Sequence, residues 1–451
     1  MLISLHLQNV GPADEMSLDF GSRLNILTGD NGLGKSFLLD IAWWALTRKW
    51  PQEIKPSLTS GLMARPTNPK KEARIAFELD SKSKSIKHTS TFQTKEQAWI
   101  AKRGRPHNPG LVLYAMPDGG FAVWDPARNY WKTKGDYESP DRPSAYLFTP
   151  MEIWNGLSDN SRGVLCNGLI ADWGNWYREK TETQTFEQLQ KVLERLSPPH
   201  EKITAGPLKR VSIDDVRDIP TIRMPYGDVP VLHASAGIRR ILSLSYLLVW
   251  AWNEHLQAAE LLGEQPTDQI IFLIDEVESH LHPKWQRVII PALMEVVSSL
   301  TEKSSGIRVQ IISATHSPLV LASLEPSFDD TRDAWFDLDM RESEQGCSVS
   351  LEKRPFEKCG DITGWLMSEA FDLKTGYSLE AEQLFTEIGA FLRQETQATE
   401  EARRLHKRLL ELVGPRDPFL FRWRAVCEQK GWLEEPTSST AAVRKTPGRT
   451  Q

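Results

Sequence analysis

Runs of consecutive apolar residues divide the chain into elements. Residues 24–28, 269–274 and 309–314 each form a short apolar run. Such runs are typical of strands that are buried on both faces of a parallel sheet. Two longer apolar stretches, 36–45 and 241–252, predict buried helices. The pattern therefore predicts an α/β fold.

A glycine-rich loop follows the first apolar run. Residues 29–36 fit the phosphate-binding pattern G-x-x-x-x-G-K-[ST]. Glycines let backbone N–H groups approach phosphate oxygens, and the start of the next helix adds partial positive charge. We expect Lys35, as a solvated loop charge, to reach the β- and γ-phosphates of ATP, and Ser36 to ligate Mg²⁺. The predicted nucleotide-binding residues are Gly29, Asp30, Asn31, Gly32, Leu33, Gly34, Lys35, Ser36 and Phe37.

The other two apolar runs end in polar side chains. The run from 269 ends in Asp275 and Glu276, and the run from 309 leads to His316. Ligands bind at the carboxyl ends of strands in open α/β sheets. Asp275 is predicted to hold Mg²⁺, Glu276 to polarise the attacking water and His316 to contact a γ-phosphate. A strand-terminal histidine in a turn is the simpler interpretation of His316 alone.

A serine and a glycine precede the second apolar helix. Ser235 and Gly237 lie in the segment His-Ala-Ser-Ala-Gly-Ile, directly before residues 241–252. Serine is a good residue to cap a helix N-terminus, which is the structural interpretation. The functional interpretation is an anion site at the helix N-terminus, offered to a phosphate held by another subunit.

These motifs together resemble the ABC-type ATPase superfamily of P-loop NTPases. The segments Ile-Phe-Leu-Ile-Asp-Glu-Val-Glu-Ser-His-Leu-His-Pro (271–283) and Ser-Ala-Thr-His-Ser-Pro (313–318) resemble its soluble RecF, SMC and OLD-type branch. The chain looks most similar to stand-alone bacterial AAA-type ATPases of antiphage defence operons. It departs from transporter ATPases in reading Ala-Ser-Ala-Gly-Ile at the signature and Val-Glu-Ser-His after Glu276. The Q-loop glutamine is unassigned, with residues 146–152 as one candidate region.

The resemblance implies a composite active site. In this superfamily the signature around Ser235 faces the P-loop of a second subunit, so the chain should form a homodimer or a higher even-numbered oligomer around ATP and Mg²⁺. The first hypothesis is an ATPase switch that controls a separately encoded nuclease or toxin. The alternative is a RecF- or SMC-like ATPase that acts on DNA directly. A transporter subunit fits poorly, because of the altered signature and the long insert.

The composition limits the function classes. The formal net charge of −6 gives no global signal for nucleic acid, so any contact with DNA or RNA needs a local basic patch. The chain starts without a basic secretory segment and has no apolar run long enough to span a membrane. The four cysteines are scattered and are interpreted as reduced thiols. We therefore expect a cytoplasmic protein without a membrane partner.

The predicted domains are discontinuous. The ATPase head takes residues 1–50 and 225–355, and an insert with a β-subdomain and a helical arm takes 51–224. In the insert we expect strands at 74–79 and 86–92, a hairpin at 111–124 with a type I′ turn at Asp118-Gly119, and helices at 162–176 and 185–196. A helical region takes 356–434, with helices at 378–392 and 398–412. Residues 435–451 are low in apolar bulk and predicted to be disordered.

Some chemically suggestive residues have simpler interpretations. Tyr130 and Trp131 near Arg128 resemble a base-stacking platform, but a small core is favoured. His280 and His282 follow the Asp-Glu strand, where a subunit contact is favoured over a metal site. The acidic residues at 337, 339 and 342 suggest a TOPRIM nuclease, but their alternation fits a β-hairpin. The basic residues at 403–408 fit a solvated helix face better than a docking site.

Overall fold

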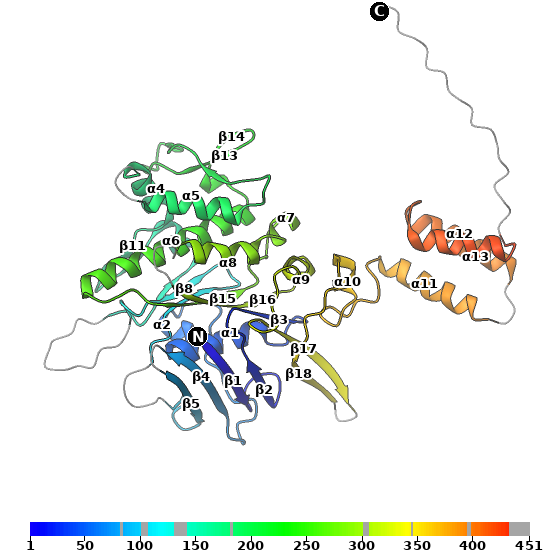
Figure 1. Cartoon of the computed structure of the whole chain (residues 1–451), viewed down its shortest axis with the longest axis horizontal. Coiled ribbons are helices and arrows are strands. Elements are labelled where there is room, and N and C mark those ends of the chain that lie inside the picture. The colour runs from blue at the N-terminus through cyan, green and yellow to red at the C-terminus, as the bar shows by residue number, and fades with distance from the viewer. Residues whose placement is uncertain are drawn as a thin grey trace, which may run out of the picture. The chain divides into compact units, whose positions relative to one another are not determined.

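The computed structural model describes residues 1–81, 84–100, 107–129, 142–180, 184–300, 306–343, 346–394 and 398–432. The chain forms two compact units, Met1–Phe371 and Asp372–Gln451 (Figure 1). The predicted disordered tail and the pair Tyr130 and Trp131 lie outside the described residues. Each unit has its own hydrophobic core and is described by itself.

An eight-stranded mixed sheet organises the first unit. Its strand order is β18-β17-β3-β16-β15-β7-β8-β9. The five central strands are parallel, and β18, β8 and β9 pair antiparallel at the two sides. The bounds are β3 Leu24–Gly29, β7 Leu111–Ala115, β8 Phe121–Trp124, β9 Tyr146–Phe148, β15 Gln269–Asp275, β16 Arg308–Ala314, β17 Ala334–Ser343 and β18 Gly346–Arg354. The three predicted apolar strands are therefore confirmed, and they lie side by side.

A smaller antiparallel sheet covers one face. Its order is β2-β1-β4-β5-β6, with bounds β1 Leu2–Gln8, β2 Glu15–Asp19, β4 Arg74–Ser81, β5 Lys84–Gln93 and β6 Ala98–Trp99. Helix α1 (Lys35–Thr47) shares one core with both sheets, and 11 of its 13 residues are buried. A helix that is apolar on all sides is expected in such a position. The predicted strands at 74–79 and 86–92 are confirmed.

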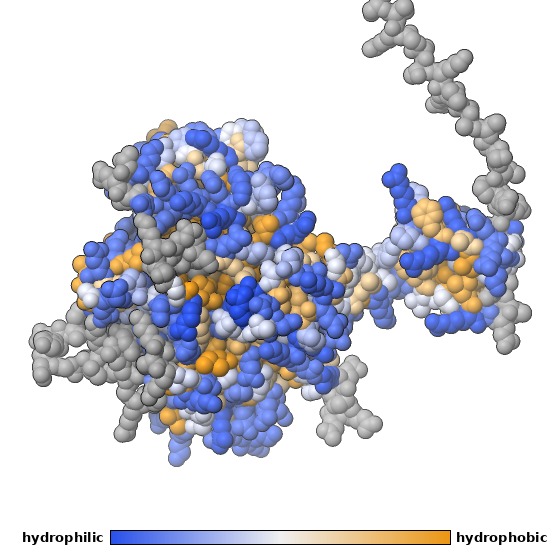
Figure 2. All heavy atoms as spheres, in the orientation of Figure 1, coloured by the Kyte–Doolittle hydropathy of each residue, from blue (hydrophilic) through white to orange (hydrophobic). Residues whose placement is uncertain are grey.

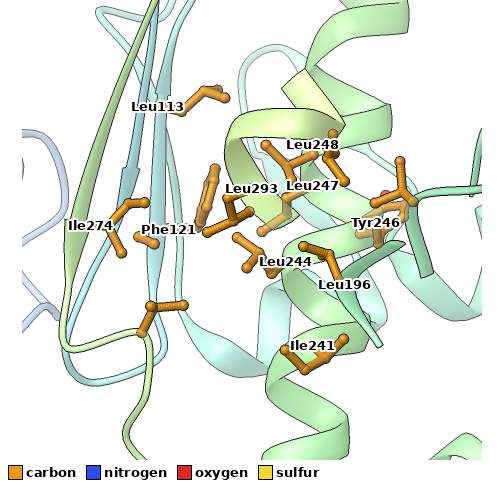
Figure 3. Packing of buried hydrophobic residues seen from close by; sticks show 14 of the residues in the cluster. Leu113, Phe121, Leu196, Ile241, Leu244, Tyr246, Leu247, Leu248, Ile274 and Leu293 are labelled. Carbon is orange, nitrogen blue, oxygen red and sulfur yellow. The ribbon is translucent and has the colours of Figure 1, made fainter. Parts of the chain in front are cut away.

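Long helices cover the opposite face of the mixed sheet. Leu113, Phe121 and Ile274 on the strands face Leu244, Leu247 and Leu248 of α6 and Leu293 of α8 (Figure 3). The helices are α6 Ala236–Leu262, α5 Thr185–Leu196 and α8 Ile289–Leu300. On the side drawn in Figure 2 the described surface of this unit is mostly hydrophilic, with scattered apolar residues. Among the described residues, none of the helices combines the length and the apolar character needed to span a bilayer.

Short elements complete the first unit. They are α2 Pro51–Ile54, α3 Pro150–Asn155, β10 Leu157–Asp159, β11 Gly163–Cys166, α4 Leu169–Arg178, β12 Thr204–Ala205, β13 Thr221–Met224, β14 Gly227–Pro230, η1 Val231–His233, α7 Pro283–Gln286, α9 Pro318–Leu324 and α10 Ile362–Leu366. The second unit packs α11 Leu379–Leu392, α12 Thr399–Leu412 and α13 Pro418–Gln429 around one core. The helices expected near 378–392 and 398–412 are confirmed, and Ser378 caps the first.

Two local predictions in the insert are wrong. Residues 162–176 are not one helix, because Gly163 and Gly168 adopt positive φ and separate strand β11 from α4. The hairpin of β7 and β8 is confirmed, but its turn is not type I′. That turn needs positive φ at Asp118, whereas only Gly119 has it, and Pro117 fixes the start of the turn. The hairpin also joins the large mixed sheet, since β7 pairs in parallel with β15.

Candidate nucleotide site

The glycine-rich loop joins β3 directly to α1. Its first residue, Gly29, has φ 127°, and a Cβ there would lie 2.1 Å from the carbonyl oxygen of Leu338 on β17. Only glycine fits this backbone at this distance. The predicted order of strand, phosphate-binding loop and helix is therefore present, with the backbone N–H groups of the first helical turn free of intrahelical partners.

Lys35 is buried, which differs from the solvated charge expected from the sequence. Its residue is 5% exposed, and its Nζ donates to the carbonyl oxygens of Gly29 (2.7 Å) and Asp30 (2.9 Å). Burial lowers the pKa of Lys35, whereas the nearby carboxylates of Glu276 and Asp275 act to raise it. The ammonium of Lys35 is thus hydrogen-bonded to the backbone of its own loop, and it lies near the acidic groups of the site.

The strand order brings the three predicted motifs to one edge. Strand β16 lies between β3 and β15, and all three are parallel. Ala314 pairs with Leu27 on one side and Asp275 on the other. The P-loop, His316 and the two carboxylates therefore follow neighbouring strands at their carboxyl ends, which is where this sheet type binds ligands.

Asp275 is an unpaired buried acid. Its residue is 1% exposed, and neither carboxylate oxygen makes a hydrogen bond of regular geometry. Burial raises its pKa to about 6, and Glu276 adds to the rise, while the nearby Ser36 hydroxyl and Lys35 oppose it. A buried carboxylate beside a serine hydroxyl fits Mg²⁺, which binds proteins through one or two such oxygens together with substrate phosphates. Within the described residues no cluster of three or more His, Cys, Asp or Glu side chains is arranged to hold a metal alone.

Glu276 and His316 meet at the open side of this edge. The Nε2 atom of His316 lies 3.3 Å from Oε1 of Glu276, and both side chains are about one-third exposed. The hydroxyl of Ser279 donates to Oε2 of Glu276 at 3.2 Å. Burial lowers the pKa of His316 and Lys35 lowers it further, while Glu276 and Asp30 act to raise it, so the net shift favours the neutral imidazole. The arrangement offers a carboxylate that can orient water and a neutral histidine beside it.

Two buried acids near the site were missed by the sequence motifs. Oε1 of Glu278 accepts hydrogen bonds from Thr315 Oγ1 (2.5 Å) and the backbone N–H of His316 (3.0 Å), so Glu278 holds the histidine loop. Asp40 on α1 accepts from the Tyr114 hydroxyl, and burial raises its pKa to about 7. No sequence signal indicated the role of Glu278 beyond its position two residues after Glu276. Its partners Thr315 and His316 lie 37 and 38 residues away along the chain.

The signature segment starts α6, as predicted. Ser235 is exposed and caps the helix, since its Oγ accepts from the N–H of Ile238 at 3.4 Å. Gly237 lies against the turn after Glu276, because a Cβ on it would be 2.6 Å from the carbonyl oxygen of His280. The cap interpretation is therefore confirmed, and the anion site for a second subunit stays a prediction.

The candidate Q-loop region is occupied by structural contacts. Thr149 and Glu152 form a reciprocal cap at the start of α3, and Glu152 also pairs with Lys55. This region includes β9, which β7 and β8 separate from β15. The strand beside β15 is β7, and its end, Met116-Pro117-Asp118, carries no glutamine.

Comparison with known families agrees with this geometry. The family described as "AAA domain, putative AbiEii toxin, Type IV TA system" matches residues 24–322, which include all the motifs of the site. The chain belongs to this family. As a member of this AAA-domain family it is also similar to the "Retron Ec83 probable ATPase" of Escherichia coli, with 27% identity over 166 residues. That match covers 37% of this chain and 26% of the relative, so the chain spans about a quarter of it.

Two further relatives and one solved structure align with different parts of this chain. The "Septu protein PtuA" of Bacillus thuringiensis is 20% identical over 319 residues, which are 70% of this chain and 71% of the relative. The "Retron Vc95 probable ATPase" of Vibrio cholerae serotype O1 biovar El Tor is 43% identical over 119 residues, which are 25% and 21% of the two chains. An SMC head domain from Thermotoga maritima aligns over 78% of this chain and 99% of its own, with 13% identity and a TM-score of 0.35. At that TM-score the likeness carries no conclusion about function.

Proposed function

We propose that this AAA-domain family member is an ATP-hydrolysing dimeric switch that controls a separately encoded effector in bacterial antiphage defence. The observation that carries the ATPase part is the buried, unpaired Asp275 beside Ser36 and Lys35, with Glu276 and His316 at the same sheet edge. Defence and the effector are supported by the sequence resemblance and by relatives named for retron and Septu systems. We propose a cytoplasmic location for this switch, where ATP is available.

The chain's own residues supply positioning and charge. The P-loop backbone and Lys35 would bind the phosphates of ATP, with Lys35 exchanging its two loop carbonyls for phosphate oxygens. Asp275 and Ser36 would hold Mg²⁺, which neutralises phosphate charge when bound. Glu276 orients the attacking water, and neutral His316 lies where the γ-phosphate would end. Catalysis then consists of holding these groups in place before the reaction.

The second subunit completes the site. Ser235 stands at an exposed helix start with N–H groups available to an anion. In the proposed dimer this helix start contacts the γ-phosphate bound to the partner's P-loop, and twofold symmetry creates two such sites. ATP favours the closed dimer and ADP does not, because only ATP makes the γ-phosphate contact.

The substitution Glu276→Gln tests the proposal. It keeps the size of the side chain and removes the charge that polarises water, while Lys35, Ser36 and Asp275 are unchanged. We expect ATP binding to persist, hydrolysis to slow by at least about 100-fold, and the ATP-bound dimer to accumulate in light-scattering measurements. In cells that carry the chain with its neighbouring genes, this variant should hold the effector permanently on or off.

Exposed Glu187 on α5 provides the matched control, and Glu187→Gln should behave as wild type. Wild-type hydrolysis by the Glu276→Gln protein would exclude the catalytic role of that residue. If the variant traps ATP without any change in association, the switch is excluded while the ATPase stands.

A further inference from the structure

A partly buried arginine joins the signature helix to the strand that ends in Asp275. Arg240 lies five residues after Ser235 on α6. Its guanidinium donates to backbone carbonyl oxygens on two other segments. The acceptors are Met116 (3.4 Å), Pro117 (3.3 Å), Asp275 (3.2 Å) and Glu276 (3.0 Å).

These acceptors are the ends of two neighbouring strands. Ile274 of β15 pairs with Ala115 of β7, so the carbonyls that follow both strands lie together. Beyond the last pair the ladder no longer supplies donors. The carbonyls of Met116 and Glu276 each accept a backbone N–H from their own turn, that of Gly119 (3.1 Å) and that of Ser279 (2.9 Å), and Arg240 adds a second donor to each. A guanidinium offers five N–H donors in one rigid plane, whereas a lysine offers three donors at a single point. In Arg240 the Nη2 atom contacts Met116, Asp275 and Glu276 and the Nη1 atom contacts Pro117, so one guanidinium reaches both segments at once.

Arg240 carries a positive charge, because a guanidinium is not deprotonated in proteins. Burial lowers its pKa, but the carboxylates of Glu278, Asp275 and Glu276 all act to raise it. A second contact joins the same two segments, since Gly237 packs against the carbonyl of His280. The first turns of α6 are thus fixed to the backbone on both sides of Glu276.

We infer that Arg240 is a positioning residue that couples the two composite sites of the proposed dimer. On one side it holds the helix start that carries Ser235, which the proposed function presents to the partner's ATP. On the other side it holds the backbone of Asp275 and Glu276, which serve the ATP bound to the same chain. A γ-phosphate that binds at Ser235 therefore favours the active position of Glu276 in the neighbouring site, and hydrolysis becomes cooperative. This coupling rests on the proposed dimer.

The substitution Arg240→Lys tests the coupling by steady-state kinetics. We expect kcat to fall at least about tenfold with KM within about threefold, the pattern for losing an interaction made in the transition state. The Hill coefficient for ATP should fall from above one to one. Arg308→Lys is the matched control, because Arg308 pairs with Asp80 at the opposite end of β16. Wild-type kcat and Hill coefficient in Arg240→Lys, or a Hill coefficient of one in the wild type, overturn the coupling.

Hydrogen exchange of the backbone at 276–282 gives a second test. ATP should protect this segment in the wild type, and both Ser235→Arg and Arg240→Lys should reduce that protection. The double variant should lose no more than either single variant, because both break one connection. If the double variant instead loses as much protection as the two single variants together, the inference is overturned. If Arg240→Lys fails to fold, unchanged protection in Ser235→Arg alone overturns it. Absence of ATP-dependent association in the wild type would instead exclude the dimer itself.

Discussion

Burial of charged side chains determines the chemistry of single residues in this site. Lys35, Asp275 and Asp40 are all buried, and each has a pKa displaced toward its neutral form. A shift in that direction means that burial destabilises the charged form of each side chain. Binding of a substrate group of opposite charge is therefore favourable. In the proposed substrate, the negative phosphates would lie beside Lys35 and the positive cation beside Asp275.

Removal of Lys35 should therefore affect binding more than folding. We expect Lys35→Ala to lower ATP affinity by at least about 100-fold, on the scale of losing a buried charge pair, as measured by titration calorimetry. Its two acceptors are loop carbonyls that water can reach once the side chain is gone, so the melting temperature should change little. Lys87→Ala on β5 is the control, because that lysine is exposed. Unchanged ATP affinity in Lys35→Ala would exclude the P-loop assignment.

Asp40 predicts a measurable pH dependence of stability. Its pKa is about 7 in the folded protein and near 3.8 when unfolded, so the folded state binds the extra proton between these values. The contribution of Asp40 is therefore complete below about pH 4 and is lost as the pH rises to about 7, by up to about 1.4 kcal/mol per pH unit.

The substitution Asp40→Asn isolates this effect. An asparagine can keep both contacts, donating to the Tyr114 hydroxyl and accepting from the N–H of Gly61, but it does not ionise. Relative to the wild type, the variant should gain stability from pH 4 to 7 in denaturant melts. Asp275 titrates in the same window, so the informative quantity is the difference between the two proteins. Parallel curves would show that Asp40 does not titrate there.

At the scale of elements, the proposed function depends most on the close packing of α6 on the turn after Glu276. A methyl group on Gly237 would lie 2.6 Å from a backbone oxygen, and neither element can move without disturbing the other. We expect Gly237→Ala to cost roughly 1–3 kcal/mol, as for overpacking, and to lower ATPase activity at least about tenfold. Activity and thermal melting measure the two effects.

Gly389 in α11 is the matched control for that substitution. It is also helical, and nothing lies within 4 Å of its missing Cβ. Gly389→Ala should stabilise its helix by about 0.5–1 kcal/mol and leave ATPase activity unchanged. Equal effects of the two substitutions would show that the contact with His280 is unimportant.

The elements differ in how far sequence could predict them. The strands β3, β15 and β16 were predicted within a residue or two, because both faces are buried and their apolar runs are continuous. The segment 162–176 was misassigned, because the conformations of Gly163 and Gly168 decide it. The place of β7 in the mixed sheet could not be predicted, since its partner β15 is more than 150 residues later. Arg240 and Glu278 act largely on backbone groups, which leave no sequence signature.

At the scale of the whole molecule, the proposed shared site predicts complementation between two inactive variants. Ser235→Arg fills the place of the partner's γ-phosphate, and Lys35→Ala removes phosphate binding. In a mixed dimer both lesions fall in one composite site, and the other site is intact. Mixing equal amounts should restore at most about a quarter of wild-type ATPase activity, since half of the dimers are mixed and each has one working site. That site uses Glu276 of the chain that carries Ser235→Arg, so the proposed coupling through Arg240 would keep the recovery below this ceiling. No recovery despite exchange of subunits, or full activity of a monomer at high dilution, would contradict the shared site.

The position of β16 also determines when the P-loop can form during synthesis. Strand β3 pairs with β16 on one edge and with β17 on the other. Strand β16 starts 284 residues after the start of β3 and β17 starts 310 residues after it, a length that takes on the order of tens of seconds to translate at typical bacterial rates. During that time one of the most apolar segments near the start of the chain lacks both its neighbours. A nascent-chain chaperone is expected to bind there, and the phosphate-binding loop is completed among the last parts of its sheet.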